Sequence, residues 1–305
     1  MRKSFFNRGP RTPGARSFAT DIAEVRRQFS SISEKFGNMP QEAGFRFGHA
    51  GPVQGEWVKV PDASPDRLIL YFHGGGYVAG SPDTHRPLIA RLCQAAQSNA
   101  FVPAYRLAPE FAFPAGLHDA IDAYRYLLQM NIAPSSIVLA GDDAGGGLAF
   151  ACMVAIRDAG LPTPAGIAAM SPWADLSLSG WSLLQNANTE TALSWDMLFV
   201  GARHYLKKQN PSDPYVSPVF ASFRDFPPVM VHAGSNEILR DDASRLGDRA
   251  AEAGVPVSVE IYDGMQHLFQ ASTQVPAAHV SIQRLGQFIK ARTASAAGEP
   301  AAEQV

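Results

Sequence analysis

The stretch "SIVLAGDDAGGGLAFACMVAI", residues 136–156, runs from an apolar strand pattern through a cluster of glycines into a helix of small residues. The strand is expected over "SIVLAG" and the helix over residues 145–158. Gly141 and Gly145 flank Asp143, as glycines do where a sharp, strained turn leaves no room for side chains beside its central residue. The alternative is a plain glycine turn in which Asp143 caps the helix. In both cases, a strand that passes directly into a helix indicates an α/β fold.

Strand and helix patterns alternate on both sides of this turn. Apolar strand patterns precede it at "FRFGHA", "GEWVKV", "RLILYF" and "AFVPAYR", and follow it at "AGIAAMS", "PVMVHAGS" and "VSVEIYDG". Helical spacing of apolar residues occupies 85–98, 117–130, 238–253 and 276–292. Strands separated by helices of this length form right-handed β-α-β units, which build a mostly parallel sheet with helices on both faces. The chain is therefore predicted to be a doubly wound α/β protein.

Two segments depart from this alternation. Residues 174–226 show helical spacing without a clear strand, and an insertion at such a place commonly forms a cap over the active-site end of the sheet. Residues 1–45 contain an amphipathic helix pattern and are predicted to form N-terminal cap helices. The core is then predicted over residues 46–173 and 227–293. The small and polar residues 294–305 are expected to form a flexible tail.

The composition excludes several classes of protein. The chain has 305 residues, of which 46% are hydrophobic and 18% are charged, and this is enough to bury one large core. The formal net charge is −2 and basic residues form no long runs, so neither nucleic acid nor an anionic membrane is an expected partner. The apolar run "LAFACMVAI" is too short to cross a bilayer, and the first residues lack the apolar core of a secretory signal. A cytoplasmic location is predicted.

The cysteines and histidines show no metal-binding pattern. Cys93 and Cys152 lie in apolar helical stretches and are expected to be buried free thiols. His73 is expected to shape its own loop through hydrogen bonds to the backbone, and His232 is expected to lie in the core. Since no cluster of histidine, cysteine and carboxylate residues has the spacing of a metal site, no metal is expected.

A second glycine run, "FHGGGYVAG" at residues 72–80, follows an earlier strand directly. Its glycines allow backbone N–H groups to approach an oxygen atom closely, as an oxyanion hole requires. Such a run is weak evidence by itself. Followed about seventy residues later by the strained turn at Asp143, it indicates the active site of a hydrolase.

Two further residues complete this active site in the order nucleophile, acid, histidine. Glu237 is the first carboxylate after the strand "PVMVHAG", with Asp241 and Asp242 as rivals, and capping of the following helix is the alternative role for its charge. His267 lies on the loop after the next strand, and it is alone among the eight histidines in that position. The predicted catalytic set is Asp143, Glu237 and His267.

The ordered motifs "HGGGYVAGS", "YRLAPEFAFPA", "GDDAGG", "SPWADL", "DPYVSP", "GSNEILRDD" and "GMQHLF" resemble the hormone-sensitive-lipase-like (family IV) carboxylesterases over roughly residues 40–292. The resemblance implies an α/β-hydrolase fold with a helical cap, and ester hydrolysis without a cofactor. It also implies an oxyanion hole formed by the N–H groups of Gly74, Gly75 and Ala144. In the same way it implies His267 as the base, oriented by Glu237.

The chain departs from this family at two positions. The family's acid is usually aspartate, and Glu237 is a mild change because its carboxylate still accepts the imidazole N–H. The serious departure is Asp143 at the position of the nucleophilic serine, since a carboxylate is a poor attacker of esters and the adduct would expel it again. Asp143 and Glu237 on either side of His267 are also expected to raise the pKa of its imidazole.

Three interpretations follow for the activity. The preferred one is a carboxylesterase for short-chain or aryl esters, disabled by replacement of its serine but still able to bind its small-molecule substrate. No serine codon becomes an aspartate codon by one base change, which favours an engineered or relic substitution. The second is an Asp-nucleophile hydrolase of the haloalkane dehalogenase or epoxide hydrolase type, in which an aromatic side chain such as Trp173, Trp181, Trp195 or Tyr77 assists the leaving group. The third is a catalytically silent binding protein.

The edge of the sheet supplies one prediction about assembly. Pairing of the strand at residues 257–262 with that of a second copy would build a homodimer.

Overall fold

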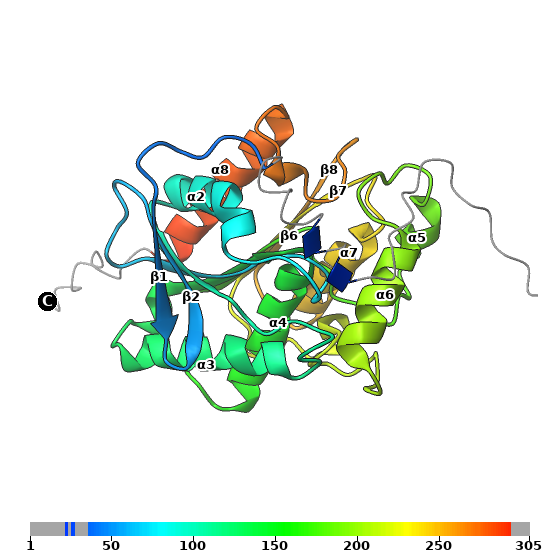
Figure 1. Cartoon of the computed structure of the whole chain (residues 1–305), viewed down its shortest axis with the longest axis horizontal. Helices are drawn as coiled ribbons and strands as arrows, with labels where there is room; N and C mark the ends of the chain where they lie inside the picture. The colour runs from blue at the N-terminus through cyan, green and yellow to red at the C-terminus, as the bar shows by residue number, and fades with distance from the viewer. Residues whose placement is uncertain (1–21, 24–25, 28–35, 294–305) are drawn as a thin grey trace, which may run out of the picture.

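An eight-stranded sheet forms the centre of the molecule (Figure 1). The computed structural model of the chain describes residues 22–23, 26–27 and 36–293. Within these residues the strand order across the sheet is β1-β2-β4-β3-β5-β6-β7-β8. The strands are β1 (Gly44–Ala50), β2 (Val53–Lys59), β3 (Leu68–Phe72), β4 (Asn99–Pro103), β5 (Ile137–Asp142), β6 (Gly166–Met170), β7 (Val229–Gly234) and β8 (Val257–Tyr262).

The sheet is mostly parallel, as the alternating pattern predicted. All neighbouring pairs from β4 through β3, β5, β6 and β7 to β8 are parallel. Only the first two strands differ, because β1 and β2 form an antiparallel hairpin and β2 pairs antiparallel with β4. Parallel neighbours need long crossover connections, and the helices between the strands supply them. The predicted doubly wound α/β class is therefore confirmed.

Helices cover both faces of this sheet (Figure 1). On one face lie α2 (Arg86–Ala96) and α8 (Pro276–Arg292), and on the other lie α3 (Ala115–Gln129), α4 (Asp143–Asp158) and α7 (Arg240–Glu252). Short 3-10 helices occur at η1 (Asp83–His85), η2 (Pro134–Ser136), η3 (Pro218–Phe220) and η4 (Phe269–Ala271). Helix α4 begins two residues before the predicted start at residue 145, because the turn at Asp143 is itself the first residue of the helix.

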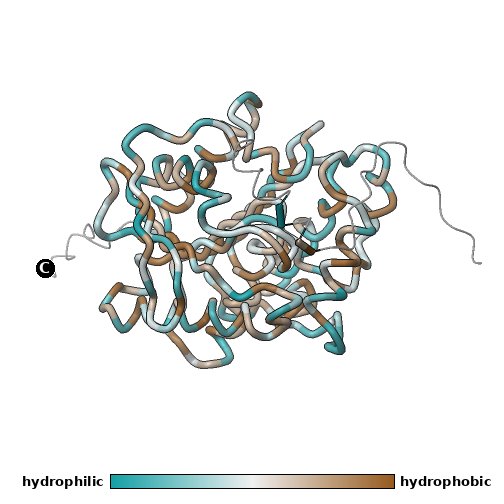
Figure 2. Tube along the Cα trace, in the orientation of Figure 1, coloured by the Kyte–Doolittle hydropathy of each residue, from teal (hydrophilic) through white to brown (hydrophobic). Residues whose placement is uncertain are grey.

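The core lies along the central strands. Every residue of β3, β5 and β6 is buried, because helices exclude water from both faces, and this explains why these strands read as continuous apolar runs. The hydrophobic colouring in Figure 2 gathers along the same strands. Cys93 and Cys152 are buried free thiols on opposite faces of the sheet, as predicted.

The segment between β6 and β7 contains helices and no strand, consistent with the helical spacing of residues 174–226. Its helices are α5 (Ser182–Gln185) and α6 (Trp195–Leu206). Helix α6 packs against the glycine loop that follows β3, since the ring of Tyr205 stacks on that of Tyr77 at a centroid distance of 4.0 Å. That this segment acts as a cap stays a prediction.

The N-terminal prediction is only partly accessible. The predicted cap helices fall mainly on residues outside those that the structure describes, and the predicted tail at 294–305 lies wholly outside them. Strand β1 begins at Gly44, within the last two residues of the predicted cap segment, and it pairs with β2 from its first residue. Among the described residues of the segment, Arg26 donates from Nε to the carbonyl oxygen of Val78 at 2.9 Å. This contact brings the N-terminal segment to the glycine loop.

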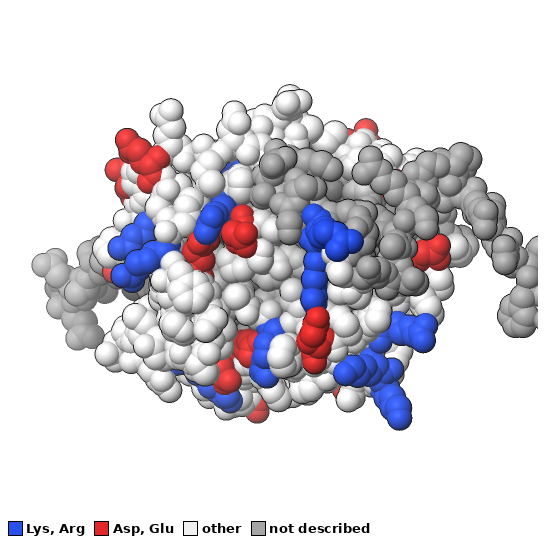
Figure 3. Space-filling view, in the orientation of Figure 1, with Lys and Arg blue, Asp and Glu red and all other residues white. Residues whose placement is uncertain are grey.

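Charged residues of both signs are interspersed on the face shown in Figure 3. Within the part of the chain that the structure describes, no helix has the length and apolar character needed to span a membrane. The same residues contain no group of three or more histidine, cysteine or carboxylate side chains arranged to hold a metal ion.

Candidate active site

Asp143 lies in a strained turn at the carboxyl end of β5. Its backbone has φ = +48°, a conformation that residues other than glycine rarely adopt. A Cβ atom at Gly141 would collide with the carbonyl of Gly145, and one at Gly145 would collide with that of Phe72. The two glycines that flank Asp143 are therefore required by close backbone approach. The plain capping turn does not describe this site, because no side chain caps the amino end of α4.

The carboxylate of Asp143 points away from its own helix and toward the glycine loop. Its Oδ2 accepts the N–H groups of Gly75 and Gly76, each at 3.0 Å. Its Oδ1 lies 3.8 Å from His267 Nε2 and has no hydrogen-bond partner among the described residues. One carboxylate oxygen thus occupies a pair of convergent N–H donors, and the other faces the imidazole.

Of the two glycine N–H groups that were expected to form an oxyanion hole, the structure directs only that of Gly75 at Asp143. The N–H of Gly74 donates to Asp142 Oδ1 at 3.2 Å, so it does not face Asp143, and Gly75 and Gly76 form the convergent pair instead. Ala144 is the second residue of α4, where N–H groups have no partner within the helix. A run of three glycines shows that N–H groups approach an oxygen atom, but only the path of the loop decides which two of them face it.

The side chain of Asp142 holds the first glycine of this loop through its hydrogen bond with the Gly74 N–H. Its fully buried carboxylate also accepts the hydroxyl of Tyr71 at 2.7 Å and lies 3.3 Å from His85 Nε2. Burial lowers the pKa of His85, but the charge of Asp142 and the hydrogen bond to it outweigh burial and raise that pKa. Burial raises the pKa of Asp142, and the same pairing outweighs it and lowers that pKa. The two groups lie within ion-pair distance of each other, next to the first glycine of the loop.

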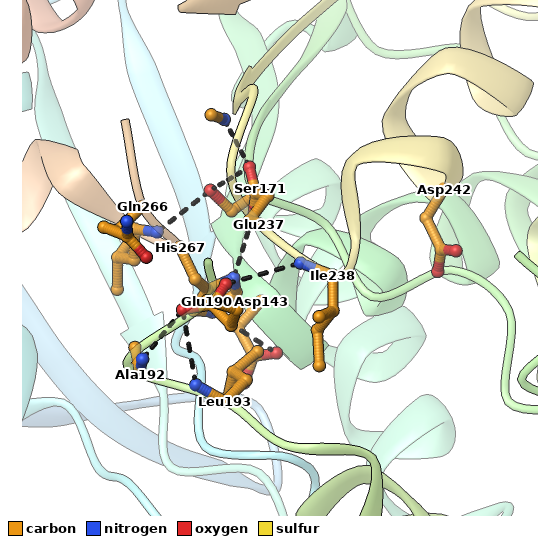
Figure 4. Close-up of polar contacts among 12 residues, drawn as sticks. Asp143, Ser171, Glu190, Ala192, Leu193, Glu237, Ile238, Asp242, Gln266 and His267 are labelled. Carbon is orange, nitrogen blue, oxygen red and sulfur yellow. Dashed lines mark hydrogen bonds and ion pairs between the residues drawn. The ribbon is translucent and has the colours of Figure 1, made fainter. Parts of the chain in front are cut away.

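His267 pairs with Glu237. The His267 Nδ1 lies 2.9 Å from Glu237 Oε2, and the carboxylate is fully buried. The other oxygen of Glu237 accepts the Ser171 hydroxyl at 3.1 Å and the N–H of Gly234. Ser171 in turn accepts the N–H of Leu268 at 3.0 Å. Figure 4 shows how Ser171 thereby links the loop of the acid to the loop of the histidine.

The rival carboxylates of Glu237 are engaged elsewhere. Asp242 accepts the N–H groups of Ala174 and Asp175, each at 2.8 Å, and it lies apart from His267 in Figure 4. Asp241 accepts the N–H of Ser182 at 2.8 Å. Glu237 is therefore the carboxylate of the three that pairs with the histidine.

The two other histidines singled out in the sequence lie where they were expected. His73 contacts the carbonyl of Gly74 through Nδ1 at 2.8 Å, and burial lowers its pKa to about 3, so it shapes the loop as a neutral ring. His232 is fully buried in β7, its Nδ1 lies 2.8 Å from the Ser281 hydroxyl, and burial lowers its pKa to about 4.

The charge of His267 follows from the carboxylates around it. Burial lowers its pKa, but the hydrogen bond with Glu237 and the negative charges of Glu237, Asp143 and Glu190 outweigh burial and raise the pKa to about 9. The direction agrees with the expectation from the sequence. Because this pKa lies above that of the unfolded chain, the charged imidazole stabilises the fold at neutral pH, and its contribution is lost as the pH rises through about 9.

An NMR titration of His267 tests this arrangement. In the parent chain we expect the imidazole to titrate well above pH 7, and in the Asp143→Ala chain at a lower pH, because one of its negative neighbours is gone. Asp196→Asn, an exposed change on α6, serves as the control and should leave the titration in place. Equal titration midpoints in the parent and the Asp143→Ala chain would refute the electrostatic coupling of Asp143 to His267.

Comparison with known proteins places this geometry in a family. Residues 69–271 match the family described as alpha/beta hydrolase fold. An acetyl-hydrolase from Streptomyces hygroscopicus is 38% identical over 276 residues, which cover 90% of this chain and 91% of that protein. An esterase from Acinetobacter venetianus is 36% identical over 238 residues, or 77% of this chain and 78% of that one. The crystal structure of an esterase from the bacterial hormone-sensitive lipase family superimposes with a TM-score of 0.87 at 36% identity, covering 90% and 92% of the two chains.

Proposed function

Since this chain belongs to the alpha/beta hydrolase family and resembles hormone-sensitive-lipase-type ester hydrolases over nine-tenths of its length, we propose that it is a carboxylesterase for short-chain or aryl esters, disabled by Asp143 at the position of the nucleophile. The observation that carries the proposal is the position of the Asp143 carboxylate. It lies between two convergent N–H groups on one side and the His267–Glu237 pair on the other. This is the position from which a serine hydroxyl attacks an ester carbonyl.

With serine at residue 143, the residues around it have defined roles. His267 takes the hydroxyl proton at Nε2, and the serine oxygen bonds to the ester carbonyl carbon. The N–H groups of Gly75 and Gly76, with that of Ala144, hold the oxyanion. The intermediate collapses as His267 returns the proton to the leaving alkoxide, and water hydrolyses the acyl-enzyme by the same steps in reverse. Glu237 holds the imidazole orientation and stabilises its charged form throughout.

With Asp143 in place, three features oppose this reaction. The carboxylate has no proton to transfer, and it leaves an adduct more readily than an alkoxide does. Its Oδ2 already occupies the N–H groups that should receive the substrate oxyanion. His267, with its pKa raised to about 9, is protonated at neutral pH and is not available as a base. The chain is accordingly proposed to bind esters and to turn them over very slowly.

One observation favours a second function, displacement at saturated carbon by Asp143. Its Oδ1 lacks a hydrogen-bond partner among the described residues and can attack, while Oδ2 is already held as the carbonyl oxygen of the resulting ester would be. Oδ1 would bond to the carbon as the halide leaves with the bonding pair. A water that gives its proton to His267 would then cleave the ester at Cγ and release the alcohol.

The aromatic residues do not support this second function. The indole N–H of Trp173 is engaged, because it donates to the carbonyl of Asp175 at 3.1 Å. Trp181 and Trp195 are exposed large hydrophobic residues. Tyr77 lies beside the glycine loop with its ring stacked on that of Tyr205. A halide leaving group would need donors directed at it, and Trp173, the buried one of these three tryptophans, has its indole N–H already engaged.

A haloalkane assay separates the two functions. The His267→Phe chain, which lacks the base for the second step, would retain an alkyl ester on Asp143 if displacement occurs. We expect no adduct by mass spectrometry and no halide release from short bromoalkanes. An adduct at Asp143, absent from the Asp143→Ala control, would establish the displacement chemistry and overturn the esterase proposal for this chain.

The experiment that tests the esterase proposal compares p-nitrophenyl acetate and butyrate hydrolysis by this chain and its Asp143→Ser variant. Ester binding without turnover by both chains would favour the third interpretation, a silent binding protein. The substrate is in each case a small molecule.

Two further predictions stay open. Strand β8 is at one edge of the sheet, so the homodimer through its pairing remains a proposal that sedimentation of the chain in solution tests. The predicted cytoplasmic location stays a prediction.

A further inference from the structure

A short segment between α5 and α6, residues 186–193, is held against the loop of the catalytic acid. Asn186 donates both amide hydrogens of its Nδ2, to the carbonyl oxygens of Ser235 and Glu237, each at 2.8 Å. Asn186 itself is 8% exposed. The backbone of Glu237 is therefore bound directly by a side chain of the predicted cap insertion. Residues 186–193 are called the clasp below.

Glu190 makes the second contact of the clasp with this loop. Its carboxylate is buried, with 8% of the residue exposed. Oε1 accepts the N–H groups of Ala192 and Leu193 at 2.7 and 3.4 Å, and Oε2 accepts that of Ile238, next to Glu237, at 3.4 Å. Figure 4 shows this carboxylate close to the catalytic residues. A buried charge is costly unless it is hydrogen-bonded, and here the donors come from both sides of the boundary between clasp and core.

The clasp also reaches the loop of the histidine. The N–H of Thr191 donates to the side-chain Oε1 of Gln266, the residue before His267, at 3.1 Å. Within the described residues, this one segment of eight residues thus binds the backbone of Glu237 and the residues next to Glu237 and His267 in the sequence. The two loops follow different strands, β7 and β8, and the clasp bridges them, as Ser171 does through its own hydrogen bonds.

We propose that the clasp aligns the His267–Glu237 pair for catalysis, with Asn186 and Glu190 as positioning residues. Asn186 fixes the backbone of the acid, and the Glu190 carboxylate fixes the next residue while its negative charge favours the charged imidazole. Its charge acts beside those of Glu237 and Asp143, which are the other carboxylates that face His267. Seating of the predicted cap insertion and assembly of the catalytic pair then become one event. The kinetic test rests on the proposed esterase function.

The kinetic test uses the Asp143→Ser chain as the parent. Asn186→Ala removes both donors to the acid loop. Glu190→Gln leaves one acceptor oxygen. This oxygen can accept either the N–H groups of Ala192 and Leu193 or that of Ile238, but not both sets. We expect each change to lower kcat roughly 10- to 100-fold with KM within about twofold, because a small misplacement of a base costs rate at a bound substrate. Asp196→Asn, an exposed carboxylate on α6, is the matched control and should leave both constants unchanged.

The pH profile separates alignment from simple loss of structure. Glu190→Gln removes a negative charge near His267, so the acid limb of kcat/KM should move to lower pH, whereas Asn186→Ala should leave the limb in place. A structural role alone would lower the fraction of active sites, measured by burst titration, without altering kcat per active site or the pH limb. That result would overturn the proposal.

A measurement on the chain with Asp143 makes the inference independent of ester hydrolysis. In this chain we expect Glu190→Gln to lower the pH at which His267 titrates by NMR, and Asp196→Asn to leave it unchanged. A shifted titration together with an inactive Asp143→Ser chain would support the clasp and refute the esterase proposal. An unchanged titration in Glu190→Gln would refute the role of Glu190 in the clasp whatever the activity.

Discussion

The Asp143→Ser chain is expected to hydrolyse p-nitrophenyl acetate and butyrate on the order of a millionfold faster than the chain with Asp143. The change supplies a hydroxyl that His267 can deprotonate and frees the N–H groups of Gly75 and Gly76 for the substrate oxyanion. It also removes a negative charge beside His267, so the imidazole returns toward its neutral, basic form at pH 7. Steady-state rates of the two chains, purified identically, give the ratio directly.

The Asp143→Ala chain is the control for this gain. It clears the carboxylate from the N–H groups and lowers the pKa of His267, but it supplies no nucleophile. We expect the Asp143→Ala chain to hydrolyse esters at a rate near that of the chain with Asp143, because only oxyanion stabilisation and substrate binding contribute. If the serine chain were no faster than the alanine chain, residue 143 would not be the nucleophile position of an esterase.

Replacing Glu237 by glutamine in the Asp143→Ser chain is expected to lower kcat roughly ten-thousand-fold, as loss of the acid's charge does in serine hydrolases. Glu237 Oε1 accepts the Gly234 N–H and the Ser171 hydroxyl. A glutamine that keeps its oxygen there must direct its NH2 group at His267 Nδ1. The proton of the neutral imidazole then lies on Nε2. This nitrogen therefore cannot accept the serine proton.

Two variants serve as controls for the Glu237→Gln change. Asp241→Asn, at a rival carboxylate that accepts the Ser182 N–H instead, should leave kcat within a few-fold of its parent. Glu237→Asp keeps the charge and should retain much of the rate that Glu237→Gln loses. Comparable losses in Asp241→Asn and Glu237→Gln would mean that Glu237 is not the residue that orients His267.

Much of the site follows from local sequence because local chemistry defines it. The glycines around Asp143 indicate a tight turn in which only glycine fits at these positions, since any Cβ there collides with a carbonyl. Glu237 and His267 were found by their places after β7 and β8, because the carboxyl ends of parallel strands lie at one edge of the sheet. The sign of the pKa shift of His267 followed from the same placement.

Other features have no local signature. Ser171 and Glu190 join the site through hydrogen bonds across 66 and 48 residues of sequence, to Glu237 and Ile238 respectively. Asp142 stands beside Asp143 in the sequence, yet its carboxylate turns to the other side of the strand, to Tyr71 and His85. The family resemblance implied Gly74 and Gly75 as donors, whereas the path of the loop directs the N–H groups of Gly75 and Gly76 at Asp143.

The sequence by itself determined the class of fold, the order of the strands along the chain and three side chains that the structure brings together, Asp143, Glu237 and His267, because hydrophobic period, glycine sterics and strand ends are local properties. Only the tertiary structure decided which N–H groups converge on Asp143, which of the rival carboxylates binds His267, and that residues 186–193 contact the loops of both Glu237 and His267. These depend on directions of individual donors and acceptors across the packed sheet. Such directions are set when distant segments satisfy each other's buried polar groups, and no short stretch of sequence contains them.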